Sequence, residues 1–204
     1  VLTTAEFEKL VDNVDADFEV AEISLEFTES LENELNRIKT EAEAAIFGGR
    51  TILVLNDYVE DAKQLTIPVL LAASTIHQYL VRIGLRTKAS IIVNSAEARE
   101  VHHFSALISF GVDAIHPYLA YATIAEAIDN KHLAVSFEKA VQKFRKGAAD
   151  GVVKVMSKMG ISTVQSYRGA QVFEAVGISK VVIDDYFTGT ASQIDGIDLQ
   201  TIGE

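Results

Sequence analysis

Cysteine and tryptophan are absent from this 204-residue sequence, and proline occurs only twice. Without cysteine the chain has no disulfide, no thiol nucleophile and no cysteine-ligated metal or cluster. It also lacks a run of about 18 apolar residues, so we expect no membrane-spanning helix. The first residues lack the basic start and apolar core of a signal peptide. We therefore expect a cytoplasmic protein.

Basic residues are in the minority. Lysine and arginine number 18 against 29 aspartates and glutamates, so the net charge is −11. Nucleic-acid binding needs a basic face, and this balance argues against such a partner. With 49% apolar residues the chain can bury a sizeable core. With so little proline and no low-complexity tract, we expect one large domain, or one domain with an appendage.

The first half of the chain alternates between two kinds of pattern. Helical spacing of apolar residues predicts helices over residues 4–10, 30–47, 69–84 and 97–110, and apolar runs predict strands over 18–27, 51–55, 89–93 and 111–115. The strand over 18–27 has one irregular step in its alternation. Strands and helices that alternate in this way are typical of parallel βα units with right-handed crossovers. We predict an α/β core over about 17–118.

The second half is predicted to be mostly helical, forming a connection over about 119–177. Helices are expected over 121–130 and 136–146, in a further stretch that stops at Gly160, and around Val172, Phe173 and Val176. Residues 161–164 fit either a buried strand or an extended link. From residue 178 we expect a surface arm, with 197–204 as a tail.

A ligand site, if the chain has one, should lie where the strands end, because parallel sheets bind ligands at the carboxyl ends of their strands. The candidates are Asn56, Asp57, Asn94, Ser95, His116 and Tyr118, joined by Ser166, Tyr167 and Arg168 if residues 161–164 form a strand. A polar turn that leads into a helix, such as 166–169, is also a common place for anion contacts. The alternative is that these residues are polar because loops are solvated.

Ionisable residues are densest at the start of the predicted helix 97–110, where the sequence has Glu97, Arg99, Glu100, His102 and His103. The Glu100–His103 spacing occurs in carboxylate-bridged metal sites, but the chain lacks the second Glu-x-x-His that such a site needs. We therefore favour a salt-bridged helix start over a metal site. Glycine-rich nucleotide loops and a Gly-x-Ser-x-Gly motif are also missing, so we assign no catalytic residue.

Two long blocks resemble one known family. Lys154–Thr163 with Gln165–Ala175 form the first block; Gly84–Lys88, Glu97–Phe104 and Pro117–Ala120 form the second. Both resemble the central region of the large subunit of glutamate synthases, and the resemblance extends to about Gly196. It implies an incomplete barrel-like arrangement of the βα units, within a central domain over 1–196. One departure is His116, where asparagine is usual.

The resemblance also implies a function. Glutamate synthases release ammonia from glutamine in a glutaminase domain that uses an N-terminal cysteine. The ammonia passes through a tunnel to a barrel with FMN, beside which three cysteines hold an iron–sulfur cluster. There 2-iminoglutarate is reduced to glutamate. Since this chain has no cysteine, it would be the middle part of such an enzyme, with no cofactor of its own and with FMN and the cluster in a neighbouring domain.

On this hypothesis the chain is a non-catalytic scaffold that contributes to the tunnel, and its partners are the glutaminase and FMN-binding domains. Interface or tunnel-side residues would be Lys154, Ser157, Lys158, Ser166, Tyr167, Arg168 and Gln171, with Glu97, Arg99 and His103 as further binding candidates. In isolation the chain is expected to self-associate. The alternatives are a stand-alone small-anion binder or enzyme that uses the strand ends and the turn 166–169, and a divergent interaction module.

Overall fold

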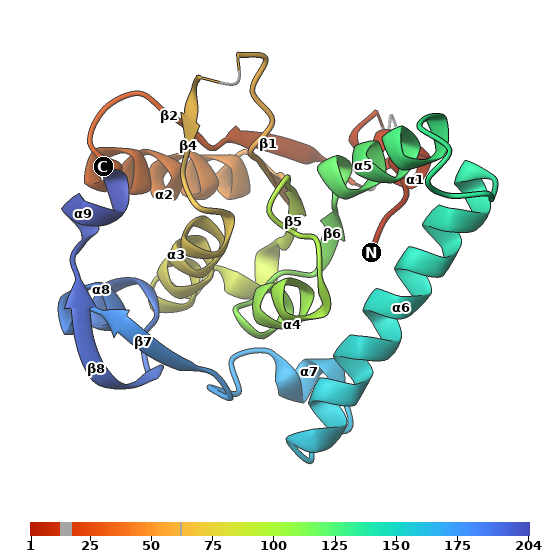
Figure 1. Ribbon diagram of the computed structural model, residues 1–204. Helices are drawn as coiled ribbons and strands as arrows, with labels where there is room; N and C mark the ends of the chain where they lie inside the picture. The colour runs from red at the N-terminus through yellow and green to blue at the C-terminus, as the bar shows by residue number, and fades with distance from the viewer. Residues whose placement is uncertain (13–17, 62) are drawn as a thin grey trace.

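A computed structural model describes residues 1–12, 18–61 and 63–204; the predicted start of the core, residue 17, lies outside them. The centre is a four-stranded parallel sheet in the order β1-β3-β5-β6 (Figure 1). Its strands are β1 (Val20–Ser24), β3 (Ile52–Asn56), β5 (Ser90–Asn94) and β6 (Ala114–His116). Each new strand is added on the same side of the last, as in a βα barrel. The sheet stays open, with β1 and β6 at its edges in the described part of the chain.

Three helices cover one face of this sheet: α2 (Leu31–Phe47), α3 (Val69–Arg82) and α4 (Val101–Ser109). Leu53, Leu55 and Val93 belong to the same buried cluster as the apolar residues of these helices. Val54 and Ile92 lie between them in sequence and are buried outside that cluster, because successive side chains of a strand point to opposite faces. We call the face away from α2, α3 and α4 the inner face.

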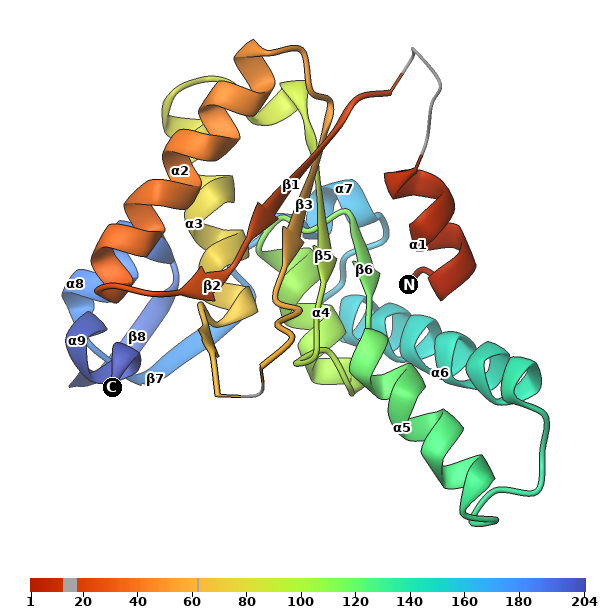
Figure 2. The same cartoon turned by 90° about the horizontal axis from the view of Figure 1, so that it is seen from above.

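The N-terminal helix α1 (Thr4–Val11) lies against the inner face. Figure 2 shows it on the side of the sheet opposite α2 and α3. It begins with a capping box, in which Thr3 Oγ1 accepts from the Glu6 backbone N–H and Glu6 accepts from the Thr3 N–H. α1 therefore closes part of the surface that would be the interior of a complete barrel.

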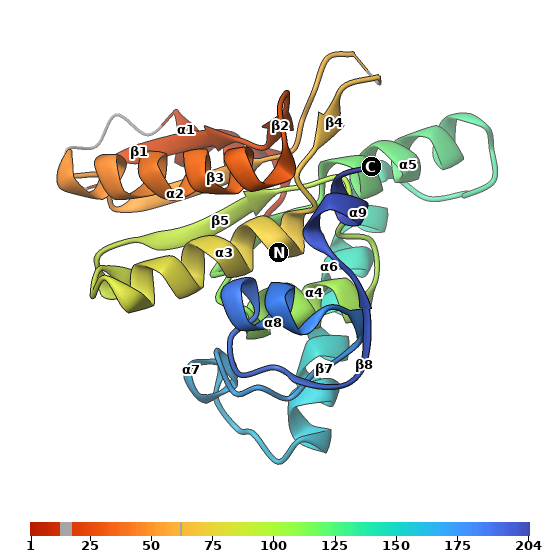
Figure 3. The same cartoon turned by 90° about the vertical axis from the view of Figure 1, so that its left-hand side faces the viewer.

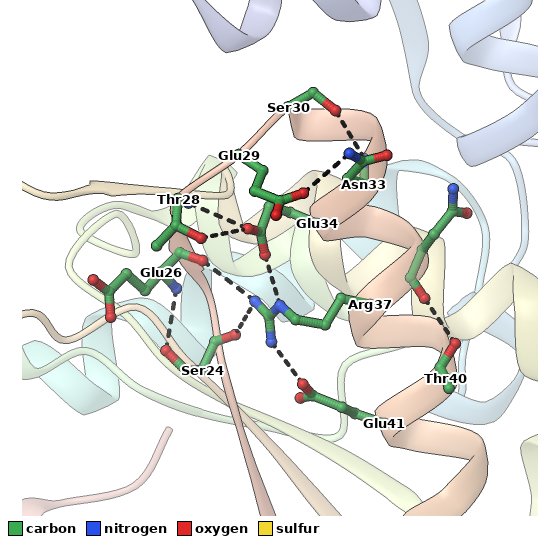
Figure 4. Close-up of polar contacts among 11 residues, drawn as sticks. Ser24, Glu26, Thr28, Glu29, Ser30, Asn33, Glu34, Arg37, Thr40 and Glu41 are labelled. Atoms are coloured by element: carbon green, nitrogen blue, oxygen red, sulfur yellow. Dashed lines mark hydrogen bonds and ion pairs between the residues drawn. The ribbon is translucent and has the colours of Figure 1, made fainter.

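The irregular step predicted in the first strand is confirmed at Leu25. Its N–H donates to Asn56 in the sheet, whereas its carbonyl accepts from Ile67 beside the short antiparallel pair β2 (Glu26–Phe27) and β4 (Leu65–Thr66). The chain thus leaves the sheet at Leu25 and is held there by Arg37 of α2. Arg37 Nη2 donates to the carbonyls of Ser24 at 2.9 Å and Glu26 at 3.3 Å (Figure 4).

The carboxylate of Glu34 completes this anchor. It accepts from Arg37 Nε at 2.6 Å and from the backbone and hydroxyl of Thr28, and its side chain is only 5% exposed (Figure 4). Burial alone would raise the pKa of Glu34, but these hydrogen bonds outweigh it and the pKa is lowered. A partly buried ion pair therefore joins α2 to the strand break.

Beyond the sheet come α5 (Tyr118–Asp129) and α6 (Phe137–Lys158). α6 runs without interruption for 22 residues, so the separate helix predicted over 136–146 is the first half of a longer one. Gly147 and Gly151 do not stop it. Close approach explains Gly151: a Cβ there would lie 2.3 Å from Val101 of α4. The helix ends before Gly160, as predicted, because that residue has a positive φ of 71°.

The remaining chain forms α7 (Val164–Tyr167), β7 (Glu174–Ile178), α8 (Lys180–Tyr186), β8 (Ala191–Ile197) and α9 (Leu199–Gly203). Residues 161–163 are the extended link rather than a strand. The helix predicted around Val172, Phe173 and Val176 is wrong, because this segment becomes β7 and pairs in parallel with β8.

The surface arm predicted from residue 178 is wrong in part. α8 buries Val182, Ile183 and Tyr186, and Ser74 of α3 donates to the Tyr186 carbonyl at 2.5 Å. Figure 3 shows α8 and the β7–β8 pair beyond α3, on the side away from the sheet. α9, within the predicted tail, contacts α2. Within residues 178–204, β8 is fully exposed along its length.

Candidate functional site

The predicted strand-end residues of the sheet come together in the structure. Ser24, Asn56, Asn94 and His116 end the four parallel strands and stand opposite one another in register. Asn56 and Asn94 come two residues after Val54 and Ile92 in the same strands, so their side chains point to the same side of the sheet, which is the inner face. Ser24 and His116 are in register with them and face the same way. The result is a polar row across the carboxyl edge of the inner face.

Hydrogen bonds join this row to Glu22 at one end and to α1 at the other. Asn56 Nδ2 donates to Glu22 Oε1 at 2.6 Å, and Asn94 Nδ2 donates to Asn56 Oδ1 at 2.8 Å. The ring of His116 lies 2.7 Å from Asn94 Oδ1 through Nδ1 and 3.2 Å from Thr4 Oγ1 through Nε2. We call the series Thr4, His116, Asn94, Asn56 and Glu22 the inner-face ladder.

The ladder defines the tautomer of His116. Since Asn94 Oδ1 can only accept, Nδ1 of His116 must carry the proton, and Nε2 then accepts from the Thr4 hydroxyl. Every hydrogen bond therefore points from Thr4 towards the Glu22 carboxylate. The imidazole also stacks on Phe7 of α1, with ring centroids 4.6 Å apart. Burial lowers the pKa of His116 to about 4, so the ring is neutral at pH 7.

Asp57 is buried directly behind this edge. Its carboxylate accepts from Ser95 Oγ at 2.7 Å and from the Ala96 N–H at 3.0 Å. Burial raises the pKa of Asp57, although hydrogen bonds from Ser95, Ala96 and Tyr118 act in the opposite direction. The phenol of Tyr118 is affected in turn: burial and the nearby Asp57 raise its pKa. Asp57 thus occupies the donors that the loop after β5 would offer to an anionic ligand.

The turn that contains Arg168 is not part of this edge. Arg168 Nη1 contacts Asp113 Oδ1 at 2.5 Å, and Asp113 Oδ2 accepts from the Ile91 N–H at the start of β5. Arg168 therefore lies at the amino-terminal edge of the sheet. The condition under which residues 166–168 would join the strand-end group is not met, because 161–164 do not form a strand of this sheet.

Its neighbours in sequence have structural contacts of their own. Ser166 lies in α7, where its N–H donates to the N-cap Thr163. Tyr167, expected at an interface, is instead completely buried, and its hydroxyl donates to the Ser105 carbonyl at 3.0 Å. Gln171 is exposed, with a positive φ of 54°.

Three of the other candidates share one surface of α6. Lys154, Ser157 and Lys158 are exposed, and their spacing of three and four residues places them on one helix face. They are accessible in this chain, as an interface would require.

Glu97, Arg99 and His103 line a groove of about 450 Å³ between the start of α4 and β7. The start of α4 differs from the prediction, because the helix begins at Val101 and Glu97 precedes it. Glu97 Oε1 instead accepts from the Val69 N–H and so caps α3. His103 Nδ1 accepts from the Arg99 N–H, and its Nε2 lies 3.6 Å from Glu100 Oε1.

Among residues 1–12, 18–61 and 63–204, the structure contains no group of three or more His, Asp or Glu side chains placed to hold a metal ion. Within the same ranges, no helix is long and apolar enough to cross a membrane.

Comparison with known proteins places these features in a family. The family described as "Glutamate synthase central domain" matches residues 1–179, which is most of the chain. The chain belongs to this glutamate synthase family. A glutamate synthase [NADPH] large chain of Bacillus subtilis (strain 168) is 58% identical over 204 residues, covering 100% of this chain. A glutamate synthase [NADH] of Schizosaccharomyces pombe is 37% identical over 211 residues, covering 99% of it.

The central domain is a small part of these relatives. The chain spans 13% of the B. subtilis protein and 10% of the S. pombe protein. A ferredoxin-dependent glutamate synthase of Oryza sativa, 39% identical over 186 residues, shows a similar proportion, with 85% of this chain covering 12% of the relative. The printed names of these relatives differ in NADPH, NADH and ferredoxin, and this chain is similar to a segment of each.

Solved structures confirm the barrel-like fold. Two structures of a doubly substituted flavocytochrome b2, one with sulfite and one with pyruvate bound, align with TM-scores of 0.50 and 0.52. The alignments cover 83% and 96% of this chain but only 38% and 47% of the flavocytochrome chains, at 16% and 13% identity. At such identity the likeness concerns the fold alone. The central domain therefore matches part of a barrel-like fold, in agreement with its open sheet.

FMN and an iron–sulfur cluster, which the family implies, do not fit the residues of this segment. The chain has no cysteine to hold a cluster. At the carboxyl edge, where a barrel would bind a flavin phosphate, Ser95 and Ala96 already donate to the buried carboxylate of Asp57. Further carboxylates, Glu22 and Glu97, lie at the same edge and would repel a phosphate.

Sequence reasoning missed several residues of both edges. Glu22 and Thr4 belong to the inner-face ladder, and Phe7 stacks on its His116. Glu22 could have been found, because it lies two positions before Ser24 in the same strand and so faces the same side. Arg86 and Asp113 join Arg168 at the opposite edge. No local pattern signals that contact, since the residues are far apart in sequence.

Proposed function

We propose that the chain is the structural central part of a glutamate synthase large subunit. In this proposal the glutaminase and FMN-binding parts of the same enzyme carry out glutamine hydrolysis and reductive glutamate synthesis. The central part holds the two centres in position and contributes to the path of ammonia between them. The family membership and the small share of the relatives' length that the chain represents support this assignment.

One structural observation carries the proposal: β8, one of the two strands of the β7–β8 sheet, is left uncovered. Parallel strands are normally buried on both faces, and a two-stranded sheet is marginal by itself. Here all seven residues of β8 are exposed. Val176 of β7 is paired with Ile194 of β8, and the two are 64% and 58% exposed. Val181 of α8 is 70% exposed as well. In the complete enzyme a neighbouring part would cover the apolar patch of Val176 and Ile194.

The exposed residues on α6 and in the link after α7 complete the proposed interface. Lys154, Ser157, Lys158 and Gln171 are accessible and carry hydrogen-bonding groups suited to the rim of an interface. Tyr167 and Arg168 support the chain from within. Glu97, Arg99 and His103 line the groove next to β7 and would lie beside the same contact.

The test uses a complete large subunit that contains this segment. Ile194→Glu places a charge in the proposed interface, and Phe47→Glu changes a 73% exposed apolar residue at the end of α2. Glutamine hydrolysis and glutamate formation are measured together. In the Ile194 variant we expect ammonia released per glutamate formed to rise at least threefold while glutaminase activity persists.

The Phe47 variant should keep the wild-type ratio. If Ile194→Glu also leaves the two activities coupled and the subunit intact, the β7–β8 surface does not take part in coupling.

The stand-alone anion binder assembled from the strand ends and the turn 166–169 is not supported, because these two groups occupy opposite edges of the sheet.

A further inference from the structure

A second cavity, of about 630 Å³, opens at the amino-terminal edge of the sheet. Its walls come from the starts of β3 and β5, from the short 3-10 helix Arg86–Lys88 before β5, and from Arg168 after α7. It is at the end of the strands opposite to the inner-face ladder. The segments that build it are distant in sequence, so the cavity is a product of the tertiary fold.

The lining is basic, although the chain as a whole has a net charge of −11. Arg86, Lys88 and Arg168 contribute three positive charges and Asp113 one negative charge, which leaves an excess of two. Hydroxyl groups of Thr51, Thr87 and Ser90 also line the cavity. A concave site of one sign concentrates the opposite ion, and this one would concentrate anions.

Arg86 is committed to the structure of the cavity. Its Nε donates to His77 Nδ1 at 2.9 Å, Nη1 to the Ala89 carbonyl at 2.7 Å, and Nη2 to the Gly111 carbonyl at 2.7 Å and to Asp113 at 3.2 Å. His77 stays uncharged beside it, because burial and the positive charge of Arg86 lower its pKa to about 4. Arg86 therefore builds the wall and keeps Asp113 in place.

The other two cations have donors to offer. Arg168 contacts Asp113 through Nη1, and its buried Nε has no hydrogen-bond partner among the described residues. Nε and Nη2 form the side of a guanidinium that binds carboxylate or phosphate with two hydrogen bonds. Binding would require the side chain to turn so that this side faces the cavity. Lys88 is exposed and makes no ion pair with any residue of the described ranges.

We propose that this cavity binds a small oxyanion with two negative charges, a phosphate or a dicarboxylate, through Lys88 and Arg168. The two negative charges match the excess of two positive charges in the lining. The hydroxyls of Thr51 and Thr87 would donate to its remaining oxygens. This site does not depend on the proposed scaffold function, since its geometry lies entirely within this chain.

The experiment titrates the 204-residue chain with sodium phosphate or glutarate by calorimetry and by thermal unfolding, with sodium chloride at matched ionic strength as reference. Lys88→Gln removes a charge that makes no ion pair in the described fold, and Lys139→Gln removes one from an exposed position at the start of α6. We expect saturable binding of phosphate or glutarate. Lys88→Gln should weaken it at least fivefold, and Lys139→Gln should leave it unchanged.

Saturable binding in the phosphate titration or in the glutarate titration identifies the ligand as phosphate-like or as a dicarboxylate. Stabilisation no greater than that of chloride in both arms would overturn the proposal, and so would equal affinity in the wild type and in Lys88→Gln. Arg168→Lys gives a second check. This variant keeps the charge but loses the two-donor side of the guanidinium, so its affinity for the anion should fall. Its cooperative thermal unfolding in sodium chloride would show that it is folded.

Discussion

His116 shows how a single side chain connects the N-terminal helix with the sheet. Its Nδ1 donates to Asn94 and its Nε2 accepts from Thr4, while its ring stacks on Phe7. In this arrangement the ring is neutral, with the proton on Nδ1. On protonation Thr4 Oγ1 would accept from Nε2–H instead of donating to Nε2, and the ring would carry a charge in a buried site, which is what lowers its pKa. The contact between α1 and the inner face therefore depends on pH.

We predict that His116→Asn reduces the acid sensitivity of folding. The folded-state pKa of His116, about 4, lies below the reference value of 6.5. The contribution of the neutral ring to the free energy of unfolding is therefore complete above pH 6.5 and is lost as the pH falls towards 4. At pH 5 this loss amounts to about 2 kcal/mol. Asparagine keeps a donor for Asn94 but does not titrate. The free energy of unfolding, measured with urea, falls from pH 7 to pH 5. That fall should be smaller in the variant than in the wild type by about 2 kcal/mol.

The same variant should be less stable than wild type at pH 7 by about 1–2 kcal/mol, because the stacking on Phe7 and the bond to Thr4 are lost. His132→Asn is the control, since His132 is exposed. If His116→Asn and wild type lose the same stability between pH 7 and pH 5, the neutral ring is not what stabilises the contact.

At the scale of elements, α6 shows tertiary contact overriding local preference. Both of its glycines weaken a helix, by up to about 1 kcal/mol each relative to alanine. Gly147 has open space around it, whereas a Cβ at Gly151 would lie 2.3 Å from the Val101 side chain of α4. One glycine is therefore a local cost, and the other allows two helices to approach.

The pair Gly147→Ala and Gly151→Ala tests this difference. Gly147→Ala should raise the free energy of unfolding by about 0.5–1 kcal/mol. Gly151→Ala should lower it by about 1–2 kcal/mol, because overpacking costs about 1–3 kcal/mol and exceeds the gain in helix propensity. Chemical denaturation of both variants measures the two signs. A stabilising Gly151→Ala would mean that α4 and α6 do not approach as closely as described.

For the molecule as a whole, the sheet is an open part of a barrel, and the apolar patch of Val176 and Ile194 has no cover within the described chain. Patches of this kind are contact surfaces. In the large subunit we propose that other domains cover the patch. In the isolated chain a second copy is the available partner.

We therefore predict that the 204-residue chain self-associates as its concentration rises. Sedimentation velocity over a range from micromolar to several hundred micromolar should show a growing share of dimers or larger species. Ile194→Glu should shift that transition to at least fivefold higher concentration, and Phe47→Glu should leave it in place. A wild-type chain that remains monomeric throughout would show that the patch is not adhesive.

Much of the fold could be predicted from the sequence because the relevant signals are local. The apolar runs at 51–55 and 89–93 indicate strands covered on both faces, and the polar residues that follow them mark a shared edge. The break at Leu25 appears as an irregular step in alternation. The residues Asn56, Asn94 and His116 were found together for the same reason, since strands of a parallel sheet end at one edge.

The sequence by itself thus determined the parallel βα core, its polar edge and, through two long blocks, the family. Tertiary structure decided what depends on distant partners. Residues 174–178 have spacing compatible with a helix, but pairing with β8 makes them a strand. Arg168 lies at the amino-terminal edge because Asp113 holds it there. Glu22 and Thr4 meet the polar row only once strand register and the packing of α1 are set, because such contacts arise between segments that no local pattern connects.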